Sequence, residues 1–339
     1  MSNYILGIES SCDDTSIAIV DTEYRVIAMK TVSQTSVHAL FGGIIPEIAA
    51  RNHIAWIFPL LRSLLDDAKM SLSDLSAIAV TTHPGLVGSL LVGVGVAKGI
   101  SVATGLPLIG INHLEAHIAS ASLNCDERPE YPFLSLIISG GHTSLIEVKK
   151  DGITTLGATM DDAAGEAFDK VAKMAGLEYP GGPVIDKLAQ KGDASLYKMP
   201  KLLTSEKYKK SYVFSFSGLK SAVQRYLKQE NIEMPSLMAA FQNSLFELVD
   251  RRIVMALKNR KYKALVVVGG VSANSELRKR MKAISLRFDT PLFLPELQYC
   301  QDNGAMTAAA AIPDFEKKLF SGLDLGAAPT KRETLSDFA

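Results

Sequence analysis

The chain is poor in cysteine and has no excess charge of either sign. Cys12, Cys125 and Cys300 are its three cysteines, and their spacing is not paired, which excludes a disulfide scaffold and is typical of a reducing cytosol. Basic and acidic residues number 36 each, so the formal net charge is zero. A broad electrostatic surface for nucleic acid is therefore not expected, although a local basic patch or a partner protein could supply one.

Segments for secretion or membrane insertion are also not expected. The apolar stretch at 4–8 runs directly into the polar residues Glu9, Ser10 and Ser11, which is unlike a signal peptide. The longest uncharged run, 75–97, is interrupted by Pro84 and by several glycines. We expect a strand, a turn and a buried helix there rather than a membrane span. The sequence predicts a cytoplasmic protein with no membrane association.

The two common phosphate-binding motifs are missing as well. The chain has no Gly-x-x-x-x-Gly-Lys-Ser/Thr and no well-placed Gly-x-Gly-x-x-Gly. A nucleotide site of the Walker or Rossmann type is thereby excluded.

What the chain does contain is a pair of histidines, His113 and His117, spaced to share one face of a helix and one metal ion. A zinc protease needs a general base directly after the first histidine. Glu115 stands one position later, about 180° from the midline of the pair, so we exclude a protease. Ordinary core or surface histidines are an equally good interpretation. Asp302 offers a third ligand, although just before a predicted helix it could equally be an N-cap; two histidines and a carboxylate suit Zn²⁺ or Fe²⁺.

A strand–hairpin–strand pattern occurs twice along the chain. Thr15-Ser16 of the first copy falls on Thr143-Ser144 of the second, an offset of 128 residues, and helices follow each copy. We predict a duplicated α/β fold with mostly parallel sheets, helices outside, and two lobes around a central cleft. The expected lobes are 1–130 and 131–321, with the helix at 303–320 as a candidate for the first lobe, and a loose tail at 322–339.

The remaining elements follow from apolar periodicity and turn residues. The expected helices are 46–68, 85–104, 163–175, 217–227, 236–257, 275–285 and 303–319, and the further strands are 77–82, 107–111, 264–268 and 291–294.

Both hairpin turns suit a phosphate, because they combine small residues with backbone and hydroxyl donors. Ser139-Gly140-Gly141 forms the second turn, and the first offers Asp13 and Asp14 to a metal or a ribose. One such turn alone is more often an ordinary hairpin, but two turns facing one cleft favour a nucleotide. The Gly269-Gly270 loop leads to Asn274, which could cap a helix as well as bind a ligand.

Taken together, these motifs resemble the TsaD family of tRNA N6-adenosine threonylcarbamoyltransferases, once described as glycoprotein endopeptidases. The matching motifs include Gly-Ile-Glu-Ser-Ser-Cys-Asp-Asp-Thr-Ser, Asn-His-Leu-Glu-Ala-His and Phe-Ser-Phe-Ser-Gly-Leu-Lys. They occupy residues 7–16, 42–51, 112–117, 139–143, 165–172, 179–182, 214–220, 269–274 and 302–306.

The resemblance implies an actin/Hsp70/sugar-kinase-like fold and a reaction. The reaction is transfer of threonylcarbamoyl from its adenylate to N6 of adenosine 37, in tRNAs that read codons beginning with A. It implies one divalent metal per subunit, Fe²⁺ rather than Zn²⁺, on His113, His117 and Asp302. The implied adenylate-binding residues are Ile137, Ile138, Ser139, Gly140, Gly141, Asp169, Gly182, Asp186 and Asn274.

Partners are implied too: a paralogous pseudo-enzyme of the same fold and a small P-loop ATPase. Because the chain is neutral, we expect it to bind tRNA weakly alone. No obligatory general base stands out, and Asp13 is a candidate for supporting the site. His83 departs from the family pattern before Pro84-Gly85, as does Gln301 beside Asp302. A small-molecule kinase of this fold or a nucleotide-binding regulator are the alternatives; a kinase would not need the histidine pair.

Overall fold

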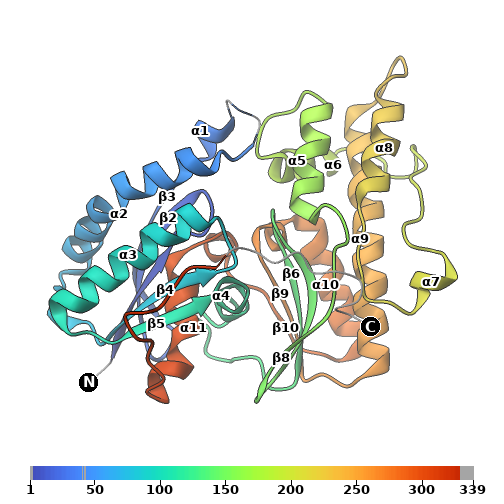
Figure 1. Cartoon of the computed structure of the whole chain (residues 1–339). Helices are drawn as coiled ribbons and strands as arrows, with labels where there is room; N and C mark the ends of the chain where they lie inside the picture. The colour runs from blue at the N-terminus through green and yellow to red at the C-terminus, as the bar shows by residue number, and fades with distance from the viewer. Residues whose placement is uncertain (1–2, 40, 42, 329–339) are drawn as a thin grey trace. The chain divides into compact units, whose positions relative to one another are not determined.

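The computed structural model describes all residues except 1–2, 40, 42 and 329–339. It forms two compact units: the first holds the chain as far as Arg128 and again from Pro295, and the second holds Pro129–Leu294. We expected the second lobe to run to residue 321, with the helix at 303–320 as a candidate for the first lobe. The chain returns to the first unit from Pro295, and helix α11 (Gly304–Glu316) belongs to that unit, as in the second of these expectations. Figure 1 shows each unit built on its own sheet.

Each sheet has five strands. In the first unit they are β1 (Tyr4–Glu9), β2 (Asp14–Asp21), β3 (Val26–Ser33), β4 (Ala77–His83) and β5 (Leu108–Asn112). In the second they are β6 (Phe133–Ile138), β7 (Thr143–Lys149), β8 (Gly152–Ala158), β9 (Ala264–Val268) and β10 (Leu292–Phe293).

The two sheets share one topology, so the expected duplication is confirmed. The strand order is β3-β2-β1-β4-β5 in one and β8-β7-β6-β9-β10 in the other. In both, the first strand pairs antiparallel with the second and parallel with the fourth. Even the register repeats at the offset of 128: Glu9 lies opposite Ser16, and Ile137 lies opposite Ser144. The expectation of mostly parallel sheets was wrong, because the hairpins make each sheet mixed.

Helices cover both faces of the first sheet. Strand β1 alternates, so that Leu6 and Ile8 join the core under α2 (Pro46–Ala68) and α3 (Val87–Thr104), while Ile5 joins the core under α11. A short helix, α1 (Thr35–Ala39), precedes α2. The approach of α11 to β1 requires glycine, since a Cβ on Gly7 would lie 2.0 Å from the carbonyl oxygen of Gly304.

Helix α3 is, among the described residues, the one helix long and apolar enough to cross a membrane by length and composition. It follows strand β4 after a turn, as expected for the run 75–97. One face is buried against the sheet at Leu90, Val94 and Ala97, whereas Leu91 on the other face is exposed.

The helices of the second unit are α5 (Ala164–Met174), α6 (Gly181–Ala189), α7 (Glu206–Lys209), α8 (Ser217–Tyr226), α9 (Met234–Asn259) and α10 (Ser275–Phe288). Helix α9 contributes the largest share of the core, where Phe241 and Phe246 pack on Phe168 of α5. Helix α7 was not expected from the sequence, because its four residues give no periodicity.

The described part of the expected loose tail is held by the first unit. The backbone nitrogen of Ala328 donates to the oxygen of Thr82, and Leu325 packs against the core. Residues 329–339 of that expected tail lie outside the described residues.

Candidate metal centre

The histidine pair stands on helix α4 (His113–Ser120), which begins directly after strand β5. The side chain of Asn112 caps the helix by accepting a hydrogen bond from the backbone nitrogen of Leu114, at 2.8 Å. The cap fixes the first turn, so His113 and His117 project from one face as expected. Their ring centroids are 4.6 Å apart, with the rings inclined at 74°. Glu115 is not part of the group they form.

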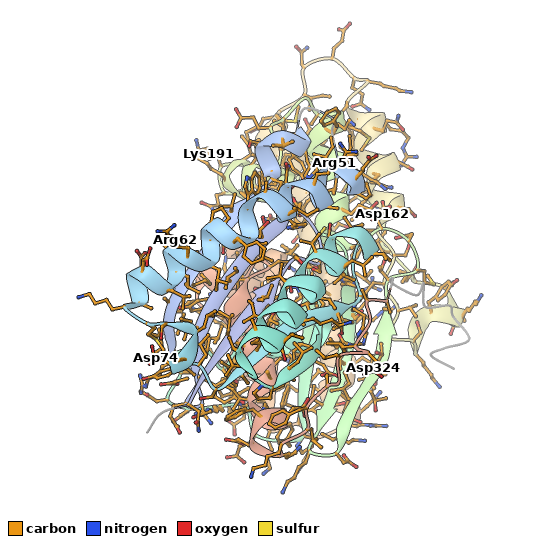
Figure 2. All side chains as sticks on the ribbon, turned by 60° about the vertical axis from the view of Figure 1, so that its left-hand side comes forward. Arg51, Arg62, Asp74, Asp162, Lys191 and Asp324 are labelled. Atoms are coloured by element: carbon orange, nitrogen blue, oxygen red, sulfur yellow. The ribbon has the colours of Figure 1, made fainter. Side chains whose placement is uncertain are left out.

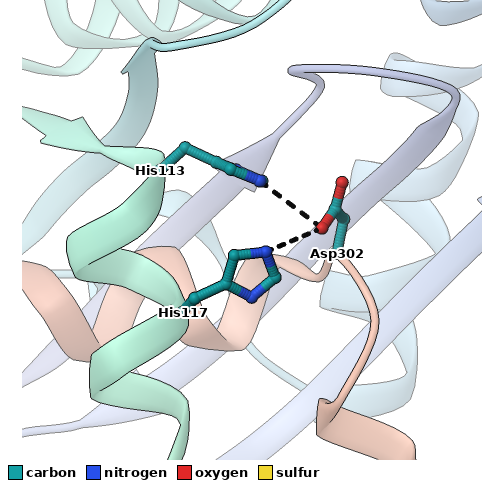
Figure 3. A group of neighbouring side chains, drawn as sticks. All are labelled: His113, His117 and Asp302. Carbon is teal, nitrogen blue, oxygen red and sulfur yellow. Dashed lines mark ion pairs between the residues drawn. The ribbon is translucent and has the colours of Figure 1, made fainter. Parts of the chain in front are cut away.

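Asp302 reaches the same place from the other end of the chain (Figure 3). Its Oδ1 lies 3.2 Å from Nε2 of His117 and 3.5 Å from Nε2 of His113. Asp302 is not the N-cap of α11: that position belongs to Asn303, whose side chain accepts from the nitrogen of Met306 at 2.9 Å. The N-cap interpretation of Asp302 is therefore wrong.

The three side chains could hold one metal ion, since their ligand atoms all lie within 4.8 Å of one another. His117 gives the sharpest indication. Its ring is 1 % exposed, yet neither nitrogen has a hydrogen-bond partner among the described residues, although Nε2 faces a carboxylate oxygen. Buried polar atoms are normally satisfied, and exceptions point to an ion or a water. Two imidazoles and one carboxylate suit Zn²⁺ or Fe²⁺ and leave coordination positions open.

Glu9 stands behind His113 and was missed as a site residue in the sequence. It ends strand β1 with no exposed surface, and its Oε2 lies 3.2 Å from Nδ1 of His113. The same oxygen accepts from the hydroxyl of Thr81 at 2.6 Å, and Oε1 accepts from the backbone nitrogen of Ser11 at 2.6 Å. A carboxylate on Nδ1 directs Nε2 toward the metal position. The available signal was a lone charged residue closing a buried apolar strand.

The electrostatics of the group are those of a cation held between two carboxylates. Burial alone lowers the pKa of His113, but the charges of Asp302 and Glu9 outweigh it and raise that pKa to about 9. Burial raises the pKa of Glu9, and His113 more than offsets this, so that the Glu9 pKa is lowered overall. A positive charge is thus favoured where a metal ion would bind.

The turn between β1 and β2 adds two more acidic groups. Burial, followed by the charge of Asp302, raises the pKa of Asp13. Burial also raises the pKa of Asp14, to about 7, with the charges of Asp302 and Asp13 contributing. The turn is braced by His53 of α2, whose ring contacts the hydroxyl of Thr15 at 2.7 Å and the oxygen of Cys12 at 3.0 Å.

The corresponding turn of the second unit carries the other predicted residues. Ile137 and Ile138 are buried at the end of β6, and Ser139-Gly140-Gly141 follow. The oxygen of Ser139 accepts from the nitrogen of Gly165 at 3.0 Å. The start of α5 therefore packs directly against the turn, and Gly165 has no room for a side chain there.

Hydrogen bonds hold the remaining residues that were predicted to bind the adenylate. Asp169 accepts from the nitrogen of Gly181 at 2.7 Å, next to Gly182, where a side chain would meet open space. Asp186 accepts from the nitrogen and hydroxyl of Ser275 at 3.0 and 2.9 Å.

Asn274 caps α10, as its sequence position suggested: its oxygen accepts from the nitrogen of Leu277 at 3.0 Å, and its amide donates to Gln242 at 2.7 Å. Gly269, five residues earlier, has φ 94° and lies against Ile138, so this loop adjoins the end of β6.

His83 takes no part in the metal group. Its Nδ1 lies 2.9 Å from the hydroxyl of Thr82, and its Nε2 lies 3.5 Å from the amide of Asn112. Gln301 contributes its backbone oxygen to the amide of Asn303, at 2.7 Å. Neither His83 nor Gln301 belongs to the group of three candidate ligands.

Comparison with known proteins decides the identity. The family model described as "TsaD: tRNA N6-adenosine threonylcarbamoyltransferase" matches residues 25–309. The chain belongs to the TsaD family. A relative of that name from Herminiimonas arsenicoxydans is 44 % identical over 328 residues, which cover 93 % of this chain and 94 % of the relative. Another, from Bdellovibrio bacteriovorus, is 43 % identical over the whole of both chains.

A solved structure supports the fold. Component A of the Acidaminococcus fermentans (R)-2-hydroxyglutaryl-CoA dehydratase has 17 % identity and a TM-score of 0.56, and the match covers 94 % of this chain and 99 % of that one. The fold is the duplicated actin/Hsp70/sugar-kinase-like fold.

As a TsaD protein, the chain is a transferase that modifies adenosine in tRNA, within the biosynthesis of N6-threonylcarbamoyladenosine. Metal dependence is general in the family, and the His113–His117–Asp302 group could hold the ion. The kinase alternative receives no support.

Proposed function

We propose that this TsaD protein transfers threonylcarbamoyl from threonylcarbamoyl-adenylate to N6 of adenosine 37, in tRNAs that read codons beginning with A. A bond forms between N6 and the carbamoyl carbon, the bond from that carbon to the phosphate oxygen breaks, and AMP leaves. N6 also gives up one proton, which is released to solvent. A neutral exocyclic amine is a weak nucleophile, so orientation of the two reactants supplies much of the rate.

His113, His117 and Asp302 would hold one divalent ion, Fe²⁺ in preference to Zn²⁺. The observation that carries this proposal is the buried ring of His117, with both nitrogens unsatisfied and one directed at Asp302. The chemistry that such an ion supplies is Lewis-acid polarisation of the carbonyl of the threonylcarbamoyl group. Glu9 would keep His113 in the ligating tautomer.

The second unit would bind the adenylate. Ser139, Gly140 and Gly141, following Ile137 and Ile138, offer backbone donors and space for close approach to a phosphate. The further residues proposed for the nucleotide are Asp169, Gly182, Asp186 and Asn274.

Asp13 would support the site from the first unit. The turn that carries it is fixed by His53, and burial together with the charge of Asp302 raises the pKa of its carboxyl.

Partner proteins would complete the system in the cytoplasm: a paralogous pseudo-enzyme of the same fold and a small P-loop ATPase. The outer face of α2 and α3 exposes large apolar side chains, Ile54, Phe58 and Leu91, which are typical of a protein–protein contact. Arg51 and Arg62 mark this outer face of α2 in Figure 2.

The test is transfer of labelled threonylcarbamoyl to unmodified tRNA, with the partners supplied. His117→Ala should lose transfer and bound metal together, because a ligand is removed. Glu115→Gln is the matched control, since Glu115 belongs to the same helix but not to the ligand group; it should keep both. Full transfer by His117→Ala would refute the metal assignment. Absence of transfer by the wild type, with all partners present, would refute the proposed reaction.

A further inference from the structure

A strongly basic stretch stands out in this otherwise neutral chain. Residues 251–263, at the end of α9 and just beyond it, contain six Lys or Arg and no Asp or Glu. The segment 207–210 adds three lysines. Both stretches belong to the second unit. Since basic and acidic residues are equal in number overall, the excess here is a local property of this surface.

These two stretches meet around a hollow of about 400 Å³. Four cations line it, Lys209, Arg251, Arg252 and Lys258, together with apolar side chains and Asn259, but no carboxylate does. The contrast with a second hollow, along α2 in the first unit, is informative: Arg62 is accompanied there by Asp66 and Asp67. Among the described residues, only Lys209 of the four cations forms an ion pair, with Glu206.

Arg252 is the least satisfied of the four. It is 2 % exposed, and its Nε and Nη1 donate to the backbone oxygens of Val213 and Tyr208, at 3.0 and 3.1 Å. Its Nη2 has no hydrogen-bond partner among the described residues. A buried guanidinium paired only with carbonyls is costly unless an anion lies near it. Burial, followed by the charge of Arg251, lowers the pKa of Arg252 to about 10, so it stays charged at neutral pH.

Structural roles account for part of this arrangement. Nη2 of Arg251 donates to the oxygen of Leu202 at 2.6 Å, so both arginines tether the segment that carries α7 to helix α9. Cations near a helix C-terminus also complement its dipole. Tethering of the α7 segment and interaction with the helix dipole do not explain why Lys258 and Lys209 both line this hollow. They also do not explain why no carboxylate lines it.

We propose that this hollow, which we call the α7–α9 basic pocket, binds the phosphodiester backbone of the tRNA substrate. Lys209 and Lys258 would contact phosphates directly at the rim, with Arg251 beside them. Arg252 would contribute its charge from below, through a region that water does not screen. Phosphate contacts supply most of the affinity in such complexes, and a chain with no net charge can make them only where its cations are concentrated.

The proposal builds on the transferase activity and is tested by binding, so that its failure can be told from failure of the reaction. The affinity of the full chain for unmodified tRNA is measured over a range of salt concentrations. Lys209→Gln with Lys258→Gln should weaken binding about tenfold at low salt. It should also lower the slope of log K against log salt by about 2, because each of the two lysines would neutralise one phosphate.

The matched control neutralises two exposed cations elsewhere, Lys191→Gln with Lys317→Gln; Lys191 is labelled in Figure 2. It should change the affinity by less than about twofold. In the transfer assay, the pocket variant should raise the KM for tRNA and leave kcat at saturating tRNA unchanged. Arg252→Met, checked for folding by thermal unfolding, should weaken tRNA binding with little change in salt slope.

Three results would overturn the proposal. The pocket variant could keep the tRNA affinity and the salt slope of the wild type, or the control variant could weaken tRNA binding as much as the pocket variant does. The third is a pocket variant that releases a partner protein while its tRNA binding stays intact. If the wild type bound tRNA but transferred nothing, the proposed reaction would fail while the binding data still decided the pocket.

Discussion

Glu9 is the residue whose replacement tests the metal centre most directly. Glu9→Gln keeps the shape of the side chain but turns one acceptor oxygen into an amide donor. Oε1 must stay an oxygen, because it accepts from the backbone nitrogen of Ser11. The amide would then face Nδ1 of His113 and the hydroxyl of Thr81. The hydroxyl can rotate to accept, whereas His113 can accept only if its proton moves to Nε2.

That tautomer places a proton on the nitrogen that lies 3.5 Å from Asp302, where the ion would bind. Replacement of such partners of metal-bound histidines typically costs 10- to 100-fold in metal affinity, which is about 1.4 to 2.7 kcal/mol. The fold should survive, since an amide at position 9 can still bond to Ser11 and to the hydroxyl of Thr81.

The assay is competition for Zn²⁺ or Fe²⁺ against a chromophoric chelator, with Glu115→Gln as the control on the same helix. We expect Glu115→Gln to bind as the wild type does. Unaltered affinity in Glu9→Gln, with the thermal midpoint also unaltered, would refute the role given to Glu9.

Three further outcomes are expected. Metal titrations should show an affinity that rises about tenfold per pH unit below pH 9, because the ion displaces the proton of His113. In the metal-free protein that proton stabilises the fold. Denaturant unfolding should show this stabilisation in full below pH 6.5 and its loss as the pH rises through about 9. Asp14→Asn should stabilise the protein by up to about 4 kcal/mol at pH 8 and not at pH 3. The reason is that the pKa of Asp14 is raised from 3.8 to about 7 in the folded protein, so ionisation of this carboxyl destabilises the fold at high pH. Equal effects at both pH values would contradict this. Gly7→Ala should destabilise the fold by about 3 kcal/mol or more, because the new methyl group would lie 2.0 Å from the carbonyl oxygen of Gly304. The control is Gly95→Ala, where a methyl group has nothing within 4 Å; it should be neutral or stabilising in the same unfolding assay.

Local patterns predicted much of each unit. The hairpins at 4–33 and 133–159 share a register because the same alternation of apolar residues recurs, and a strand whose one face is buried has little freedom to slip. Helix α2 begins at Pro46 and ends at Ala68, as expected, because proline favours the first turn and the apolar spacing stops there. Whether neighbouring strands run parallel or antiparallel was not predictable in the same way, because the sequence of one strand does not identify its pairing partner.

The candidate metal ligands were predictable in residue type but only partly in role. His113 and His117 are four residues apart, and the helix that joins them is local. Glu9 contacts His113 across 104 residues, Thr81 across 72 and Thr307 across 298. No periodicity encodes such distances; they depend on how β1, β4, α4 and α11 pack. The same holds for Asp302, where only the structure shows that Asn303 provides the cap.

The first unit is closed by the last part of the chain, and this has a consequence for synthesis. His113 and His117 leave the ribosome early, but Asp302 and α11 follow only after the whole second unit, Pro129–Leu294. At typical elongation rates the interval is about 10 to 40 seconds. During that time the nascent first unit would have two of the three candidate ligands and an uncovered sheet face, so an ion held by all three could load only onto nearly complete chains. A chain that ended before Asp302 would lack the third candidate ligand.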